Sequence, residues 1–132
     1  MPLRIPDPFL GYNELECDWV GERSWTYRVQ LPAISASRRE RKNVLAFDGL
    51  DTFAVVKLDG ATILESDNMW IPHRIDVTRE LDDDDKEHTI EIDFASALLE
   101  ARKIKDAHPE HKWVGYNGDM ARLAVRKAQY HW

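Results

Sequence analysis

The sequence predicts an all-β fold, a β-sandwich or jelly roll, with one short helix near residues 97–107. Apolar and polar residues alternate with period 2 in several segments, which is typical of strands that bury one face. An Asp-Gly pair separates two of these segments, as in a tight hairpin. Turn-forming residues recur at short intervals, which favours many short strands. At 132 residues the chain has the length of one domain.

Residues 1–24 are predicted to be an extended lead-in. The residues that interrupt regular structure there are Pro2, Pro6, Pro8, Gly11 and Gly21. The first strand is predicted at Trp25–Leu31. Its apolar side chains share one face, which is expected to be buried as in other antiparallel sheets; they are Trp25, Tyr27, Val29 and Leu31.

A hairpin is predicted from Phe53–Leu58 and Ala61–Glu65, joined by Asp59 and Gly60. A type I′ turn needs positive φ at both central residues, and Asp and Gly tolerate it. Other short strands are predicted at Val44–Phe47, at Arg74–Val77, and where Ile90, Ile92 and Phe94 alternate with acidic residues.

One helix is predicted over Ala97–Ala107, with Ser96 as its N-cap and Pro109 as a stop. Leu123 and Val125 suggest a last strand that leads into residues 129–132. Two polar segments between strands are predicted to be loops, the basic Ser35–Lys42 and the highly charged Asp82–Lys86.

Composition excludes several classes of protein. Lys and Arg number 18 and Asp and Glu 24, and this formal charge of −6 argues against a nucleic-acid partner. No apolar run approaches the roughly 18 residues of a membrane span, so no membrane partner is expected. The chain shows no secretory signal and no Asn-x-Ser/Thr sequon, which predicts an intracellular protein.

No catalytic, metal or cofactor site is predicted within the chain. Glu14, Glu16 and Asp18 are interpreted as solvating a loop, because the geometry of a glycosidase carboxylate pair does not follow from an irregular segment. His108 and His111 flank a proline and lack further ligands at zinc spacing. The single Cys17 has no identifiable base or orienting group beside it, and a buried or half-buried thiol is expected.

Five tryptophans leave carbohydrate binding open, because aromatic rings stack on the apolar faces of sugars. Trp25 is interpreted as a core residue from its position in a strand. Three others sit beside turn-like residues and are left as core, edge or interface residues; they are Trp19, Trp70 and Trp113.

Several segments, in order, resemble the β-mannosidases of glycoside hydrolase family 2, especially the fungal intracellular type. The first are Ile5-Pro-Asp-Pro-Phe-Leu-Gly-Tyr-Asn-Glu-Leu-Glu16 and Trp19-Val-Gly-Glu-Arg23. The others are Phe47-Asp-Gly-Leu-Asp-Thr-Phe53, Leu58-Asp-Gly60, Glu65-Ser-Asp-Asn-Met69, Pro72-His-Arg-Ile-Asp-Val-Thr78 and Val125-Arg-Lys-Ala-Gln-Tyr-His-Trp132. Asp59 departs from the family, which usually has Asn there.

The resemblance implies that residues 1–132 are a single, incomplete fragment of the N-terminal galactose-binding-like jelly-roll β-sandwich, truncated at both ends. In the family, additional strands precede the first motif. A Gly-Trp-Asp-Trp-Gly-Pro segment follows the last motif, and its Trp-Asp pair lies at the mannose subsite. The catalytic glutamates lie in a later (β/α)8 barrel that this chain lacks.

The expected function is therefore that of a non-catalytic domain of a β-mannosidase, an enzyme that removes terminal, non-reducing β-D-mannose with retention. The chain alone is expected to be inactive, to pack on the barrel, and to lie beside the oligosaccharide only in the full enzyme. The residues expected nearest the substrate, or supporting the loop beside it, are Arg126, Lys127, Gln129, Tyr130, His131 and Trp132. Two alternatives are a stand-alone carbohydrate-binding module and an incomplete gene product without independent activity.

Overall fold

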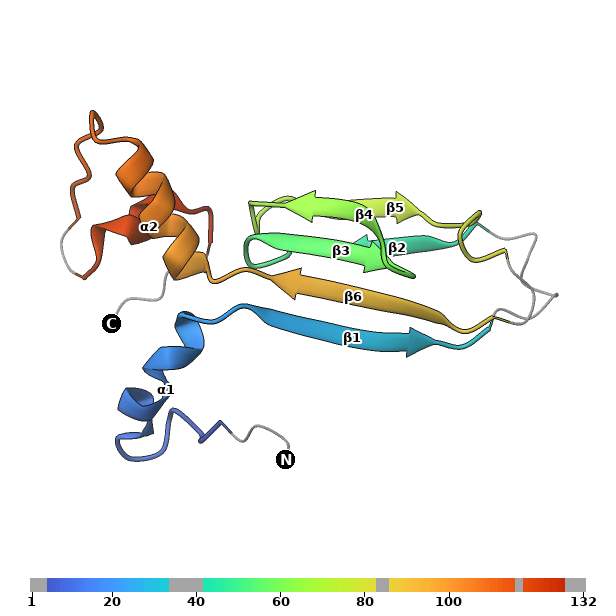
Figure 1. Cartoon of the computed structure of the whole chain (residues 1–132), viewed down its shortest axis with the longest axis horizontal. Helices are drawn as coiled ribbons and strands as arrows, with labels where there is room; N and C mark the ends of the chain where they lie inside the picture. The colour runs from blue at the N-terminus through green and yellow to red at the C-terminus, as the bar shows by residue number, and fades with distance from the viewer. Residues whose placement is uncertain (1–4, 34–41, 83–85, 116–117, 128–132) are drawn as a thin grey trace.

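The computed structural model describes residues 5–33, 42–82, 86–115 and 118–127 (Figure 1). The helices are α1 (Asn13–Gly21), α2 (Ala97–Ala107) and the 3-10 helix η2 (Met120–Ala124). The strands are β1 (Trp25–Leu31), β2 (Val44–Phe47), β3 (Ala54–Leu58), β4 (Ala61–Ser66), β5 (His73–Asp76) and β6 (His88–Phe94). Six predicted strand segments are thus confirmed, with boundaries shifted by a residue or two.

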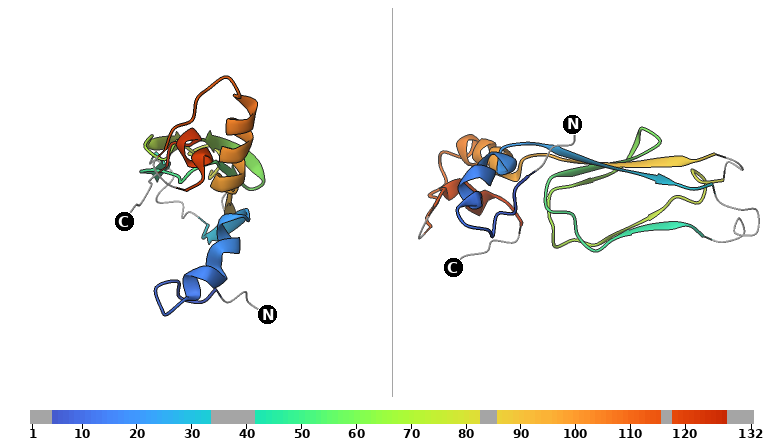
Figure 2. Two further views of the ribbon diagram at one scale, coloured as in Figure 1. Left: turned by 90° about the vertical axis from the view of Figure 1, so that its left-hand side faces the viewer. Right: turned by 90° about the horizontal axis from the view of Figure 1, so that it is seen from below.

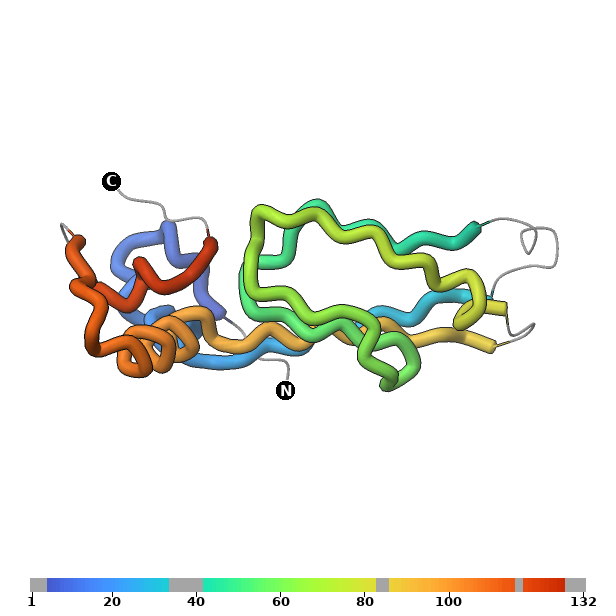
Figure 3. Tube along the Cα trace, turned by 90° about the horizontal axis from the view of Figure 1, so that it is seen from above, coloured from blue at the N-terminus to red at the C-terminus, as the bar shows by residue number. Residues whose placement is uncertain are grey.

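The strands form two antiparallel sheets stacked in two layers (Figure 3). One sheet has the order β1-β6-β3-β4, and the other pairs β2 with β5. The predicted sandwich architecture is therefore confirmed. In the four-stranded sheet, β1 and β4 are edge strands among the described residues, because each pairs on one side only.

The predicted hairpin between β3 and β4 is confirmed. Asp59 has φ of 50° and Gly60 has φ of 83°, as a type I′ turn requires. The register shifts between Val56 and Lys57, so the hairpin carries a bulge close to its turn.

The core lies between β3 and the two-stranded sheet. Ala54, Val56 and Leu58 point inward from β3 and are buried, and Ile90 continues this face on β6. The remaining buried members of the cluster come from connecting segments and are Leu50, Val77 and Leu81.

The prediction that β1 buries its apolar face is wrong. Registers across β6 place Tyr27 and Val29 on the same face as Val56 and Leu58, yet Tyr27 is 64% exposed and Val29 53% exposed. The reason is the width of the second layer: β2 and β5 stack behind β3 and β4, and β1 lies to one side of them (Figure 1). Half of the inner face is therefore uncovered.

The prediction of an extended lead-in is also wrong, because residues 13–21 form α1. This stretch contains no proline, and Glu14 and Glu16 lie in the first turn, where acidic side chains interact favourably with the helix dipole. The Asp7 side chain accepts a hydrogen bond from the Phe9 amide, and the Asn13 side chain donates to the Asp7 carbonyl. Of the described prolines here, Pro6 and Pro8 both lie before the helix.

The predicted helix α2 is confirmed with its cap. Ser96 Oγ accepts a hydrogen bond from the Leu99 amide at 3.1 Å and donates one to the Gly21 carbonyl at 2.6 Å. The first of these satisfies an amide at the helix start, and the second ties α2 to the end of α1. No helix among the described residues is long and apolar enough to span a bilayer.

The strand predicted around Leu123 and Val125 is wrong, because residues 120–124 form η2. The Asp119 side chain accepts a hydrogen bond from the Ala121 amide, which caps η2. It also forms an ion pair with Arg102 of α2, which holds η2 against that helix. Most of the two predicted loops, Ser35–Lys42 and Asp82–Lys86, lies outside the described part of the chain, which omits residues 34–41 and 83–85.

Candidate binding cleft

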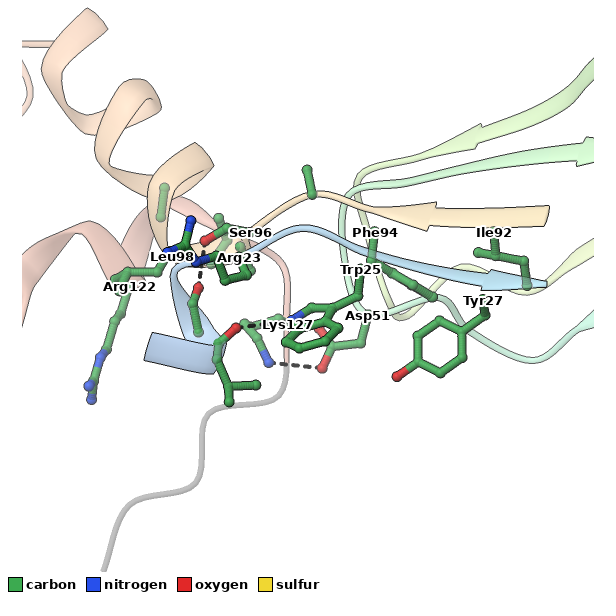
Figure 4. A pocket seen from close by; sticks show the side chains of 16 residues that line it. Arg23, Trp25, Tyr27, Asp51, Ile92, Phe94, Ser96, Leu98, Arg122 and Lys127 are labelled. Atoms are coloured by element: carbon green, nitrogen blue, oxygen red, sulfur yellow. Dashed lines mark hydrogen bonds and ion pairs between the residues drawn. The ribbon is translucent and has the colours of Figure 1, made fainter. Parts of the chain in front are cut away.

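A cleft lies at the end of the sandwich where α1, β1, β6, α2 and the segment after η2 meet (Figure 4). Its volume is about 790 Å³. Its walls are Val20, Gly21, Arg23, Trp25, Tyr27, Asp51, Ile92, Phe94, Ala95, Ser96, Ala97, Leu98, Ala101, Arg122, Val125 and Lys127. Most of these side chains are apolar, and the cleft continues the uncovered half of the inner face.

Three aromatic residues form the floor of the cleft. Trp25 is fixed by a hydrogen bond from its indole Nε1 to the Val20 carbonyl at 3.1 Å, and its ring lies 5.8 Å from that of Trp19. Tyr27 meets the edge of Phe94 at 5.8 Å with an interplanar angle of 89°. These contacts leave apolar ring surface facing the cleft, as Figure 4 shows for Trp25 and Tyr27.

One ion pair joins two residues that line the cleft. Lys127 Nζ lies 2.8 Å from Asp51 Oδ2, and both side chains are partly shielded from solvent. The pair joins the connection between β2 and β3 to the segment that leaves η2. Asp51 was not singled out in the sequence, because the two residues lie 76 positions apart and nothing local marks them as partners.

The structure places two of the six residues predicted to lie nearest the substrate. Lys127 lines the cleft, whereas the Arg126 carbonyl accepts a hydrogen bond from the Met69 amide at 3.0 Å. Arg126 also forms a parallel bridge with Asn68. The other four, Gln129, Tyr130, His131 and Trp132, lie outside the described residues.

The other candidate groups stay apart. Glu14, Glu16 and Asp18 are exposed on α1, so they solvate a helix and not a loop. Cys17 is half-buried, as expected, with its Sγ 3.5 Å from the Pro6 carbonyl. In the described parts of the chain, no three His, Cys, Asp or Glu side chains are grouped so that they could hold a metal ion.

A second, more polar cavity lies beside β4 and β6 and includes Glu65, Asp67 and Asp93. Asp93 accepts hydrogen bonds from Lys57 Nζ at 2.7 Å and from Thr26 at 2.5 Å. These hydrogen bonds lower the pKa of the Asp93 carboxyl, and the bond from Lys57 has the larger effect. A general acid needs a raised pKa, so Asp93 is unsuited to that role.

The described carboxyl groups with a clear pKa shift all have a lowered pKa. They are Asp59, Asp76, Asp93, Glu110 and Asp119. At Asp59 the pKa falls to about 2, chiefly because the Thr89 amide donates to the carboxylate at 2.8 Å, and further because of His88 at 2.7 Å. Hydrogen bonding to the ionised form is thus the common cause.

Comparison with known proteins decides the family. Residues 3–132 match the family described as glycosyl hydrolase 2 galactose-binding domain-like. The chain belongs to this family. It is 60% identical over 131 residues to Beta-mannosidase B of Emericella nidulans and 56% identical to that of Aspergillus terreus, with 98% of the chain covered in each case. The predicted family resemblance is thereby confirmed.

A solved structure agrees with this assignment of the galactose-binding-like domain. The chain superposes on the β-D-mannosidase of Dictyoglomus thermophilum with a TM-score of 0.76 and 31% identity, over 96% of its length. It spans 15% of that protein and 15% of the two fungal relatives. The similarity therefore concerns one galactose-binding-like domain within much longer proteins.

Proposed function

We propose that this chain is a non-catalytic sandwich domain of a β-mannosidase that removes terminal, non-reducing β-D-mannose with retention. The observation that carries the proposal is the 60% identity to Beta-mannosidase B over nearly the whole chain. In this role the domain packs beside a catalytic barrel and supports the segment after η2 at the rim of the substrate pocket.

The cleft itself supports a non-catalytic role. A retaining glycosidase needs two carboxyl groups about 5 Å apart, one as nucleophile and one as acid. Among the described residues, the cleft walls contain a single carboxylate, Asp51, and it is paired with Lys127. An ion-paired carboxylate without an acid opposite it cannot perform both steps of the reaction.

The Asp51–Lys127 pair also supports the proposed placement of the substrate-adjacent residues. It fixes the course of the chain immediately before residues 129–132. The position of those residues beside the substrate stays a prediction, and so does the intracellular location of the protein.

The test compares the chain alone with a chimera. In the chimera, this chain replaces the matching 131 residues of Beta-mannosidase B of Emericella nidulans. We expect the chimera to hydrolyse a chromogenic β-mannoside and the purified 132-residue chain to show no turnover. Turnover by the chain alone, or a folded chimera without β-mannosidase activity, would overturn the proposal.

The aromatic floor of the cleft favours a second candidate, an independent carbohydrate-binding module. Trp25, Tyr27 and Phe94 offer ring surface to the cleft, with Arg23 and Lys127 among the polar groups that line it. Titration calorimetry of the chain with mannose, mannobiose and galactose distinguishes the two. Saturable binding at millimolar affinity or tighter would favour the binding module over a purely supporting domain.

A further inference from the structure

A group of exposed apolar side chains lies outside the cleft, in the first turn of α1 and the segment that leads into it. Phe9, Leu10, Tyr12 and Leu15 are between 68% and 96% exposed. We call these four residues the α1 patch. Clusters of large exposed apolar side chains are uncommon on monomers and mark interaction surfaces.

The α1 patch belongs to an ordered arrangement. Before the helix, Asp7 and Asn13 brace the turn that carries Phe9 and Leu10. In its last turn, the Val20 and Gly21 carbonyls accept hydrogen bonds from the Trp25 indole and from Ser96. Because these contacts already fix the backbone on both sides, a partner would meet a preorganised surface.

Two residues of the α1 patch also belong to a row of apolar side chains on α1, and the rest of the chain covers this row only in part. Tyr12, Leu15 and Trp19 follow one another at three- and four-residue spacing, which places them along one side of the helix. Trp19 is half-buried against Trp25, whereas Tyr12 and Leu15 are exposed. In Figures 1 and 2, α1 stands off the end of the sandwich, away from both sheets.

Charge defines the partner further. Residues 5–23 contain five acidic residues and one basic residue. Asp7, Glu14, Glu16 and Asp18 are all exposed around the patch. A complementary surface therefore has an apolar centre and a rim of lysine or arginine.

We propose that the α1 patch is the docking surface for a further domain of the same polypeptide, one that presents an apolar surface with a basic rim. The inference rests on the proposed function, in which the chain is one domain of a longer enzyme, and the relatives are long enough to supply that domain. Phe9 and Tyr12 alone expose on the order of 300 Å². That is a fitting centre for an interface of about 800 Å² per partner.

The test uses hydrogen exchange in the same chimera. Tyr12→Ser combined with Leu15→Ser is expected to speed amide exchange over residues 13–21 by about tenfold, because the docked face is lost. The matched control is Val114→Ser, a substitution of an apolar residue 70% exposed on the segment after α2. We expect no change in α1 exchange in the control. Equal exchange in the two variants would overturn the inference.

A second variant keeps the test decisive if the serine variant fails to fold. Asp18→Lys alters one exposed side chain outside the first turn of α1, and it is expected to speed α1 exchange by placing positive charge against the basic rim. Unchanged exchange in this variant contradicts the proposed partner. Protection that rises with protein concentration, together with a dimer in light scattering, assigns the patch to a second copy and also overturns it.

Activity of the unsubstituted chimera separates this inference from the proposed function. An inactive chimera whose α1 exchange still depends on the patch contradicts the function and supports the docking surface. An active chimera in which the patch variants and the control show the same α1 exchange supports the function and overturns the docking surface.

Discussion

Asp59 links the chemistry of one residue to the stability of the sandwich. Its carboxylate accepts hydrogen bonds from the Thr89 amide, His88 Nδ1 and Lys86 Nζ, and its own amide donates to the Thr89 carbonyl. These contacts lock the turn of the β3–β4 hairpin onto the start of β6. Asn also tolerates positive φ, but it lacks the charge that Lys86 meets here. The charge of Asp59 therefore has a structural role at this turn.

This network predicts a dependence of stability on pH. The pKa of Asp59 is about 2 in the folded chain, against 3.8 for the ordinary group. The stabilisation of about 1 to 2 kcal/mol is therefore fully present above roughly pH 4 to 5 and is lost as the pH falls toward 2. Asp59→Asn should reduce the free energy of unfolding at pH 7 and flatten its decline below pH 4 in urea titrations. Asp67→Asn, at an exposed carboxylate, serves as control.

At the scale of single elements, Ser96 joins two helices that lie far apart in the sequence. Its hydroxyl caps α2 and donates to the end of α1, and the residue is 5% exposed. Ser66 offers a matched comparison, since its Oγ is buried without a hydrogen-bond partner among the described residues.

Ser96→Ala should lower the free energy of unfolding by about 1 to 2 kcal/mol, because the cap is lost and the Gly21 carbonyl loses its donor. Ser66→Ala should be neutral or slightly stabilising, because no hydrogen bond is removed. Chemical denaturation of the two variants measures the difference. Equal destabilisation would mean that the Ser96 contacts contribute no more than an unpaired hydroxyl.

The elements also show where sequence patterns suffice. Period-2 alternation located the strands, and Asp59-Gly60 fixed the hairpin because positive φ at both positions leaves few alternatives. Helix α1 escaped prediction because prolines and glycines surround it and none of its residues is buried, so it shows no core-facing stripe. Alternation in β1 correctly gave the residues that share a face. It could not tell what covers that face, since the cover depends on which strands stack opposite.

At the scale of the whole molecule, the described chain is a sandwich with one half-covered layer. The inner side of β3 is sealed by β2 and β5, while that of β1 opens into the cleft and solvent. The cleft itself arises where five segments meet, and its ion pair spans 76 positions. Such long-range geometry has no local signature, which explains why Lys127 was singled out only by resemblance and Asp51 not at all.

Two valines on this one inner face report whether the second layer becomes complete in a longer protein. Val56 is fully buried and Val29 is 53% exposed in the described chain. In the chain alone, Val56→Ala should lower the free energy of unfolding by roughly 2 kcal/mol and Val29→Ala by well under 1 kcal/mol, because only the first removes methyl groups from a packed core.

In the chimera with Beta-mannosidase B, Val29→Ala should lower the free energy of unfolding nearly as much as Val56→Ala if further strands cover β1. Thermal and denaturant unfolding of both variants in both proteins measures this, and a cost at Val29 that stays small in the chimera would show that the half-face remains open.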